Sequence, residues 1–361
     1  MGFLSPDIGI DLGSTSVVLY VTGRGIVLRE PSLVVARNDT SREVVAIGEE
    51  ARAMLGRMPA DLISVHPMLQ GVIADFELTV LMLKYFLRLA IGINRLGKPR
   101  AVVAIPGEIT EMERRAVEEA FRMAGFRSVR MVEAVVAAAH GSGLPVYDPQ
   151  GSLVVDIGGG TVECAVLSMG DIVVGRSERQ AGMAWDEAVA AYIKKMHNLL
   201  IGDRTAEEVK IDLGSAIPPN PIARSMKTDT SDETEPGGVG STRRAMVRGR
   251  DLVTGLPQTI EVSSEQVYEA LKEPMRQILD LLTWTLERTP PELAVDIVRS
   301  GIHLTGGGAL LPGIDQMLAN ELGIPAQVAR NPMDCVALGT GYLATNLELL
   351  SRIGKNHPLT D

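Results

Sequence analysis

The sequence predicts an α/β fold made of two similar lobes, and three observations support this prediction. First, residues 8–21 and 153–166 repeat one pattern: an apolar strand, a turn opened by Asp-x-Gly, and a second apolar strand. Second, Asp11 and Asp156 hold the same place in the two copies, which implies that one supersecondary unit was duplicated. Third, strands and helices alternate along the chain, as they do in α/β proteins.

The elements expected around and between the two copies follow from periodicity, capping residues and glycines that stop helices. Each copy continues into a third β-rich run, at residues 25–36 and 170–176. Between the copies we expect a helix at 79–93, a strand at 100–105, a helix at 110–124 capped by Thr110, a strand at 129–132 and a helix ending at Gly141.

The second half of the chain continues this alternation. Helices are expected at 185–200, from a capping box at 205–208 onward, and from Ser263 or Ser264 to about Glu287. A strand at 302–305 enters a run of three glycines, and helices follow at 312–322 and 334–347. Residues 225–244 differ, because they hold four acidic residues and a Pro-Gly-Gly run with almost nothing apolar. We expect a mobile surface loop there.

Composition narrows the classes of function. A chain of 361 residues is too long for one ordinary core and suits two domains or lobes. The net charge of -10 argues against nucleic acid as a partner, because neutralising phosphates requires a basic surface. Two cysteines and no secretory signal fit a reduced, cytoplasmic protein, and no apolar run is long enough to cross a bilayer.

Three glycine-rich turns, at residues 13–16, 158–161 and 306–309, carry the chemistry that the sequence predicts. Tight turns without side chains let successive N–H groups converge on phosphate oxygens. An aspartate at the end of each preceding strand can hold Mg²⁺ through water. Two such hairpins that face each other would clamp a polyphosphate between the lobes. The Walker A and G-x-G-x-x-G patterns are both absent, which excludes those two phosphate-binding solutions.

These paired hairpins and the later Thr-Gly-Gly-Gly resemble the superfamily of actin, Hsp70 and the sugar kinases. Over nearly its whole length, the chain resembles the MreB/Mbl family of bacterial actins. The matching segments include residues 8–13, 71–75, 204–207, 249–257, 289–293, 304–311 and 335–341. The resemblance implies an actin-like, ribonuclease H-like fold of two duplicated lobes and four subdomains around a nucleotide cleft. The paralogue, MreB or Mbl, stays open.

The resemblance also implies how the chain divides into lobes. Lobe I would span residues 1–145 and 320–361, with a small subdomain at about 29–65. Lobe II would span residues 146–319, with a small subdomain at about 183–260 that contains the insertion at 225–244.

Site residues follow from the resemblance position by position, with ATP or ADP and Mg²⁺ as the expected ligands. The phosphates would be held from both sides, Mg²⁺ and its waters would be positioned by the aspartates, and the ribose and base would lie beyond. The residues implied are Gly13, Ser14 and Thr15 for one end of the phosphates; Gly158, Gly159, Gly160 and Thr161 for the other; Asp11 and Asp156 for Mg²⁺; and Glu207, Lys210, Gly306 and Gly307 for the ribose and adenine. Without the resemblance, Glu207 and Lys210 would be interpreted as an exposed helical ion pair.

Departures from the family pattern concern hydrolysis. The family's Glu-Glu-Pro-Met reads Glu133-Ala-Val-Val here, and the glutamate that orients the attacking water falls on Ala134. Glu133 and Thr161 remain as candidate catalytic residues, although adjacent residues on a helix point in different directions. Ser16 and Met183 also replace residues usual in the family. We therefore expect nucleotide binding with slow or impaired ATPase activity.

Family members assemble on the inner face of the cell membrane. Ile93 and Leu96, beside basic residues, would suit an anionic bilayer surface, the alternative being a helix end packed on the core. The implied partners are other copies of the chain in protofilaments, with antiparallel pairs as one arrangement, and membrane proteins of cell elongation. Three alternatives remain: an actin-like nucleotide-binding adaptor that forms no filament, an actin-fold kinase with Asp75 as a candidate base, and a chaperone-like ATPase.

Overall fold

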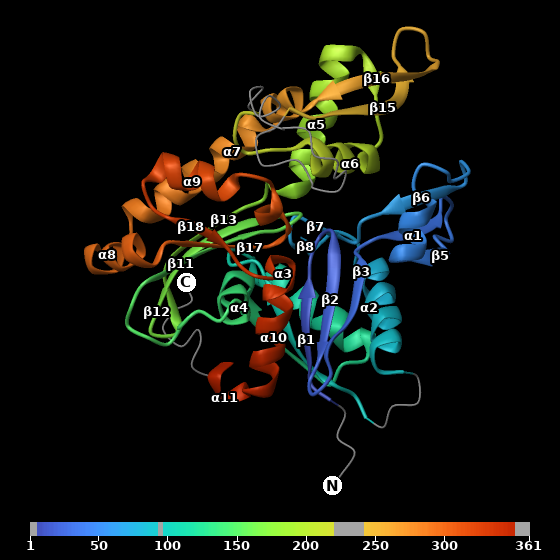
Figure 1. The fold of residues 1–361 in the computed structure, drawn as a ribbon. Coiled ribbons are helices and arrows are strands. Elements are labelled where there is room, and N and C mark those ends of the chain that lie inside the picture. The colour runs from blue at the N-terminus through green and yellow to red at the C-terminus, as the bar shows by residue number, and fades with distance from the viewer. Residues whose placement is uncertain (1–5, 93–96, 220–241, 351–361) are drawn as a thin grey trace, which may run out of the picture.

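The computed structural model describes residues 6–92, 97–219 and 242–350 (Figure 1). The first of its two large sheets has the strand order β10-β9-β1-β2-β3. Its strands are β1 (Ile8–Leu12), β2 (Ser16–Val21), β3 (Gly25–Pro31), β9 (Arg100–Ile105) and β10 (Ser128–Glu133). The second has the order β13-β12-β11-β17-β18. Its strands are β11 (Ser152–Ile157), β12 (Val162–Ser168), β13 (Asp171–Glu178), β17 (Ile302–Thr305) and β18 (Ala326–Val328).

The two sheets share one topology, which confirms the predicted duplication. In each, three consecutive strands form an antiparallel meander, β1-β2-β3 and β11-β12-β13. Two parallel strands then extend the sheet on the other side of the first strand, β9 and β10 in one case and β17 and β18 in the other. Parallel strands need helical crossovers, and the helices lie where the sequence alternation placed them.

Two helices, α4 (Ala134–Gly141) and α10 (Cys335–Thr345), pack against each other between the two sheets (Figure 1). They cross closely because glycine stands at the contact: a Cβ on Gly141 would overlap the carbonyl oxygen of Cys335, and one on Gly339 would overlap that of Ala137. Both helices are mostly apolar, and they share a buried cluster with residues of β9, β11 and β12. Residues of β11 and β12 are buried throughout, as expected for strands covered on both faces.

Two small sheets lie toward the upper part of Figure 1. One has the order β5-β4-β6, from β4 (Val34–Arg37), β5 (Val44–Ile47) and β6 (Leu62–Val65), beside α1 (Glu49–Met54). The other has the order β14-β15-β16, from β14 (Leu199–Leu200), β15 (Arg244–Asp251) and β16 (Pro257–Ser263), beside α6 (Asp203–Leu213). The remaining elements are β7 (Met68–Leu69), β8 (Val72–Ile73), α2 (Phe76–Ile91), α3 (Glu111–Ala124), α5 (Gly182–His197), α7 (Ser264–Glu287), α8 (Pro291–Ser300), η2 (Gly307–Leu310), α9 (Ile314–Leu322), η3 (Pro332–Asp334) and α11 (Leu347–Leu350).

Several element boundaries differ from the sequence prediction, each for a local reason. The helix expected at 185–200 ends at His197, because Asn198 adopts a left-handed conformation (φ 51°) and the next two residues pair with β15. The capping box at 205–208 is wrong: α6 begins at Asp203 after Gly202, which places Thr205 inside the first turn. The last helix breaks at Asn346. The loop expected at 225–244 lies outside the described residues up to 241, and Arg244 already belongs to β15.

The predicted division into lobes stays a prediction. In this structure the chain leaves the second sheet only after β18, rather than at residue 320, because β18 pairs with β17. Within the described parts of the chain, no helix is long and apolar enough to span a membrane.

Candidate functional site

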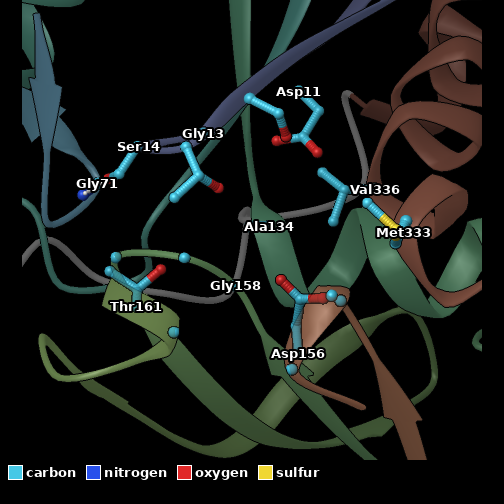
Figure 2. A pocket seen from close by; sticks show the side chains of 18 of the residues that line it. Asp11, Gly13, Ser14, Gly71, Ala134, Asp156, Gly158, Thr161, Met333 and Val336 are labelled. Atoms are coloured by element: carbon cyan, nitrogen blue, oxygen red, sulfur yellow. Dashed lines mark hydrogen bonds between the residues drawn. The ribbon is translucent and has the colours of Figure 1, made fainter. Parts of the chain in front are cut away.

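A cavity of about 370 Å³ lies between the two Asp-x-Gly hairpins (Figure 2). Its wall includes both hairpin turns, the third glycine-rich turn, and residues of α5 and α6. A volume of this size is typical of small-molecule sites, which cluster between lobes and domains. Every predicted nucleotide and Mg²⁺ residue lines it: Asp11, Gly13, Ser14, Thr15, Asp156, Gly158, Gly159, Gly160, Thr161, Glu207, Lys210, Gly306 and Gly307.

The two hairpin turns have the same backbone geometry. The N–H of Gly13 donates to the carbonyl oxygen of Ser16 at 3.0 Å, and the N–H of Gly158 donates to that of Thr161 at 2.9 Å. The turns also touch, since a Cβ on Gly160 would lie 2.8 Å from the Cβ of Ser14. Glycine in the second turn therefore keeps the two turns close together and leaves backbone amides open to a ligand.

Ser14 links the first turn to the hairpin of β7 and β8. Its hydroxyl accepts a hydrogen bond from the N–H of Gly71 at 2.9 Å, and the side chain is almost fully buried. A hydroxyl that accepts one bond can still donate its own proton. The hydroxyl of Ser14 can therefore donate its proton to a ligand in the cavity that Ser14 lines.

The carboxylates of Asp11 and Asp156 come from opposite sides of the cavity (Figure 2). Thr305 donates to Asp156 through its hydroxyl at 2.8 Å, which fixes that side chain. Burial raises the pKa of Asp11 to about 7, with a further contribution from the charge of Asp156, and burial raises the pKa of Asp156 to about 6. Two partly desolvated carboxylates in one cavity favour a bound cation.

The donor set fits Mg²⁺ held indirectly. Within residues 6–92, 97–219 and 242–350, no group of three His, Cys, Asp or Glu side chains could ligate a metal. Mg²⁺ commonly keeps several waters and takes its other oxygens from phosphates. Asp11 and Asp156 would then hold the ion's waters, as the sequence predicts.

Glu207 and Lys210 both line the cavity from α6, but each pairs with a different residue. The Nζ of Lys210 lies 2.8 Å from Oδ1 of Asp186 and donates to the carbonyl oxygen of Gly182 at 3.1 Å. Glu207 makes an ion pair at 3.3 Å with Arg52 of α1. The alternative interpretation, an exposed ion pair between Glu207 and Lys210, is therefore wrong.

Asp186 is a cavity residue that the sequence analysis missed. Burial is the main reason that its pKa is raised to about 6, which the neighbouring Lys210 opposes. Its position, one helical turn after the glycine that opens α5, is the signal that could have indicated it. Apolar residues of the wall were also missed, because nothing in the sequence shows that they face the cavity: Trp185, Ile211, Leu310, Leu311, Pro312, Pro332, Met333 and Val336.

The third glycine-rich turn combines a structural glycine with an open one. Gly306 has a φ of +81°, and a Cβ there would overlap the carbonyl oxygen of Ile157. A Cβ on Gly307 would meet nothing within 4 Å, although Gly307 also lines the cavity. Only the first of these glycines is required by the fold.

Ala134 lines the cavity, whereas Glu133 is absent from its wall. Glu133 ends β10 and precedes the first residue of α4, so the two residues do not share a helix as expected. The carboxylate of Glu133 points toward Gly107, in a second cavity of about 250 Å³. The strand end turns Glu133 away from the first cavity, and its placement there gives no support to a catalytic role.

Glu163, which the sequence analysis did not single out, lines both cavities. It lies on β12, opposite Asp156 of β11. Burial raises the pKa of Glu163 well above its ordinary value, and the charges of Asp156 and Glu133 add to this effect. An acidic residue within an otherwise apolar strand was the available signal.

The predicted membrane residues, Ile93 and Leu96, lie outside the described residues. Asp75, the candidate base of a kinase, caps α2 by accepting from the N–H of Leu78 at 3.1 Å. It also pairs with Arg42 at 2.7 Å, and it is not part of the cavity wall. These contacts account for Asp75 as a structural residue.

Comparison with known proteins gives the family. The family described as MreB/Mbl protein matches residues 5–352. The chain belongs to the MreB/Mbl family. It is 47% identical over 346 residues to the cell shape-determining protein Mbl of Bacillus cereus, covering 96% of this chain and 98% of that protein. It is 43% identical to the cell shape-determining protein MreB of Escherichia coli, over 94% of this chain and 93% of that protein.

Solved structures confirm the actin-like fold predicted for this MreB/Mbl member. MreB 5 of Spiroplasma citri bound to AMPPNP superposes with a TM-score of 0.84 at 36% identity, covering 95% of this chain and 97% of that chain. The same protein bound to ADP also gives a TM-score of 0.84. The MamK double helical filament, at 20% identity and a TM-score of 0.75, shows the likeness of fold alone.

Proposed function

We propose that this MreB/Mbl protein binds ATP or ADP with Mg²⁺ in the cavity between the hairpins and assembles into filaments that determine cell shape. One observation carries the proposal: two glycine turns of the same geometry, each preceded by an aspartate, line one cavity from both sides. Relatives named as cell shape-determining proteins and a relative bound to AMPPNP and to ADP support the ligand and the role.

In the proposed complex, the first turn binds one end of the phosphates and the second turn binds the other end. Bound Mg²⁺ would neutralise phosphate charge, with its waters held by Asp11 and Asp156. The base would lie against Gly307 and the apolar wall, and the ribose would lie near Glu207 and Lys210. Each named residue lines the cavity.

We propose slow hydrolysis for this site. The side chain at position 134 is a methyl group, which cannot accept a hydrogen bond from an attacking water. Positioning by the turns and charge stabilisation by Mg²⁺ would still support a low rate.

We further propose that filaments assemble on the cytoplasmic face of the cell membrane, with cell-elongation membrane proteins as partners, and organise cell-wall synthesis. The support is the family membership and the expected apolar and basic character of residues 91–100.

The test combines binding, assembly and phosphate release. Purified protein with ATP, ADP or no nucleotide would be imaged by negative-stain electron microscopy, with and without anionic liposomes. Nucleotide-dependent filaments on the lipid are the expected result. Monomers under every condition, despite measured nucleotide binding, would reject filament formation and favour the nucleotide-binding adaptor, which the methyl group at Ala134 also suits.

A matched pair of variants tests the site itself. Gly307→Ala adds a methyl group to the cavity without meeting protein atoms, so nucleotide affinity should fall about tenfold while the apo protein keeps its stability. Gly202→Ala is the control, because a Cβ there also meets nothing within 4 Å and Gly202 is not part of the cavity wall. Equal affinity in both variants would place the nucleotide elsewhere.

A further inference from the structure

Glu163 is a buried carboxyl group whose position the proposed binding site does not yet explain. The residue is 2% exposed, and neither carboxylate oxygen has a hydrogen-bond partner among the described residues. The backbone amides of Gly107 and Val135 face it, but neither completes a hydrogen bond of ordinary geometry. Burying a polar group without a partner destabilises a fold, so such a group in a native protein calls for a functional reason.

The duplicated hairpin shows that the fold does not need this carboxyl group. Asp11 pairs with Val18 across β1 and β2, and Asp156 pairs with Glu163 across β11 and β12. Val18 and Glu163 therefore hold the same place in the two copies. Val18 is also buried, at 1% exposed, so an apolar side chain satisfies this position in the same supersecondary unit.

The strand register directs Glu163 toward the proposed phosphate site. Residues directly opposite on antiparallel strands point to the same face of the sheet, so Glu163 shares a face with Asp156. Thr161 lies two residues earlier on the chain, just before β12 begins, and its side chain enters the same cavity (Figure 2). All three residues line the larger cavity. The carboxyl group lies next to the second turn, where the terminal phosphate would be bound.

We propose that Glu163 orients the water that attacks the terminal phosphate of ATP, the role for which Ala134 has no suitable group. This inference rests on the proposed function, in which ATP binds between the two turns. An unpartnered carboxyl oxygen in the cavity wall accepts a hydrogen bond from the water and directs its lone pair toward phosphorus. The larger cavity, which Glu163 lines together with Asp156 and Thr161, gives room for that water between the carboxyl group and the terminal phosphate.

The reaction is balanced without a change in Glu163. The water oxygen forms a bond to the γ-phosphorus, and the bond between that phosphorus and the β–γ bridging oxygen breaks. ADP keeps the electron pair of the broken bond, and both water hydrogens leave with the inorganic phosphate. Glu163 contributes orientation, which typically accounts for a factor of about 10² in rate or more.

The test compares Glu163→Val, Glu163→Gln and wild type in single-turnover phosphate release, nucleotide binding and thermal unfolding. Glu163→Val copies the first hairpin and removes the acceptor, so kcat should fall at least about tenfold with KM and nucleotide affinity unchanged. Glu163→Gln keeps a carbonyl oxygen and should retain a measurable part of the rate. Ala134→Glu in the Glu163→Val background should restore release, since it supplies a carboxylate from the same cavity wall.

Glu108→Val is the matched control, because Glu108 lines only the second cavity and should leave the rate unchanged. Wild-type release in Glu163→Val, or no release at all by the wild type despite nucleotide binding, would overturn the role of Glu163 and leave the binding proposal intact. Failure of the wild type to bind ATP would instead reject the proposed function. A folded Glu163→Val variant, verified by its melting temperature, makes these outcomes distinct.

Discussion

The two Asp-x-Gly hairpins have the same backbone and different side chains. Both keep the aspartate, the glycine of the turn and the hydrogen bond that closes it. The first turn offers the hydroxyls of Ser14 and Thr15, whereas the second offers bare backbone at Gly159 and Gly160. The copies therefore share what the hairpin and the proposed Mg²⁺ site require, and they differ in side chains that neither of these needs.

The difference continues into the strands. The first hairpin has an apolar residue, Val18, where the second has Glu163. The side chains at both positions are buried, so the two copies pack equally closely around unlike groups. In a duplicated fold, each copy shows which residues the other copy needs for folding. A buried polar residue that destabilises one copy, where the other copy has an apolar residue, is therefore a candidate functional residue.

Exchanging these two residues should produce the largest effects. Val18→Glu places a carboxyl group at a site that is 1% exposed in an apolar sheet, so we expect a loss of about 4 kcal/mol or more, or insoluble protein. Glu163→Val should instead stabilise the apo protein by about 1–3 kcal/mol, because it removes an unpartnered polar group. Urea unfolding measures both.

Equal destabilisation by Val18→Glu and Glu163→Val would contradict the comparison. It would mean that each position is adapted to its own residue for packing. Val18 would then no longer show that the fold can do without a carboxyl group at the position of Glu163.

The contact between the turns should give the next largest effect. In Gly160→Ala the new Cβ would lie 2.8 Å from the Cβ of Ser14 and 3.0 Å from the Cα of Gln70, so the turns must separate. We expect nucleotide affinity to fall by about 10- to 100-fold, equivalent to about 1.4–2.8 kcal/mol. Isothermal titration with ADP and Mg²⁺ measures this, with Gly202→Ala as the unaffected control.

Most of the fold could be predicted from the sequence because its signals are local or repeated. The strands at 100–105 and 302–305 have the predicted bounds, since each is a short apolar run with clear ends. The start of α6 was predicted wrongly, because Gly202 rather than Thr205 precedes the helix and the capping pattern alone cannot tell which residue comes first. β14, of two residues, depends on its partner β15 and carries no local signal.

The residues of the candidate site also fall into those that a local or repeated signal predicts and those that depend on tertiary contacts. The turns and aspartates could be found because a motif repeats, and the register that put Ala134 in place of the family's glutamate agrees with its place in the cavity wall. Asp186 and Glu163 were missed, because a position one turn into a helix or an acidic residue in an apolar strand does not by itself show which strands and helices meet across the cavity. Glu133 and Ala134 are adjacent in sequence, and only the end of β10 separates them into two cavities.

The pH dependence of stability should distinguish the two aspartates by a smaller effect. In the folded apo protein the pKa of Asp11 is raised from 3.8 to about 7, and that of Asp156 from 3.8 to about 6. Between pH 3.8 and these raised pKa values, the folded state binds more protons than the unfolded state. The contribution of the two aspartates to the stability of the fold is therefore fully present below about pH 4 and is lost as the pH rises toward 7.

Asp11→Asn should therefore raise the melting temperature of the apo protein by about 2–5 °C at pH 8 and have little effect at pH 4.5. Asp156→Asn should also raise the melting temperature at high pH. Its effect should reach its full size at a lower pH than that of Asp11→Asn, because the pKa of Asp156 is raised only to about 6. Comparing each variant with wild type removes the opposite contribution of His140 and His303, whose pKa values are lowered by burial. A wild-type curve and an Asp11→Asn curve that run parallel from pH 4.5 to 8 would contradict the assignment.

The ion pair between Arg52 and Glu207 should have the smallest effect, although it joins α1 to α6 beside the cavity. Its side chains are 44% and 38% exposed, and such pairs contribute about 0–1 kcal/mol. If the two hairpin turns control binding, Arg52→Ala should change ADP affinity by less than about threefold, with a weak dependence on salt. A loss of ADP affinity as large as that in Gly160→Ala would mean that this ion pair, rather than the paired turns, controls binding. The difference between the hairpins would then explain hydrolysis but not nucleotide affinity.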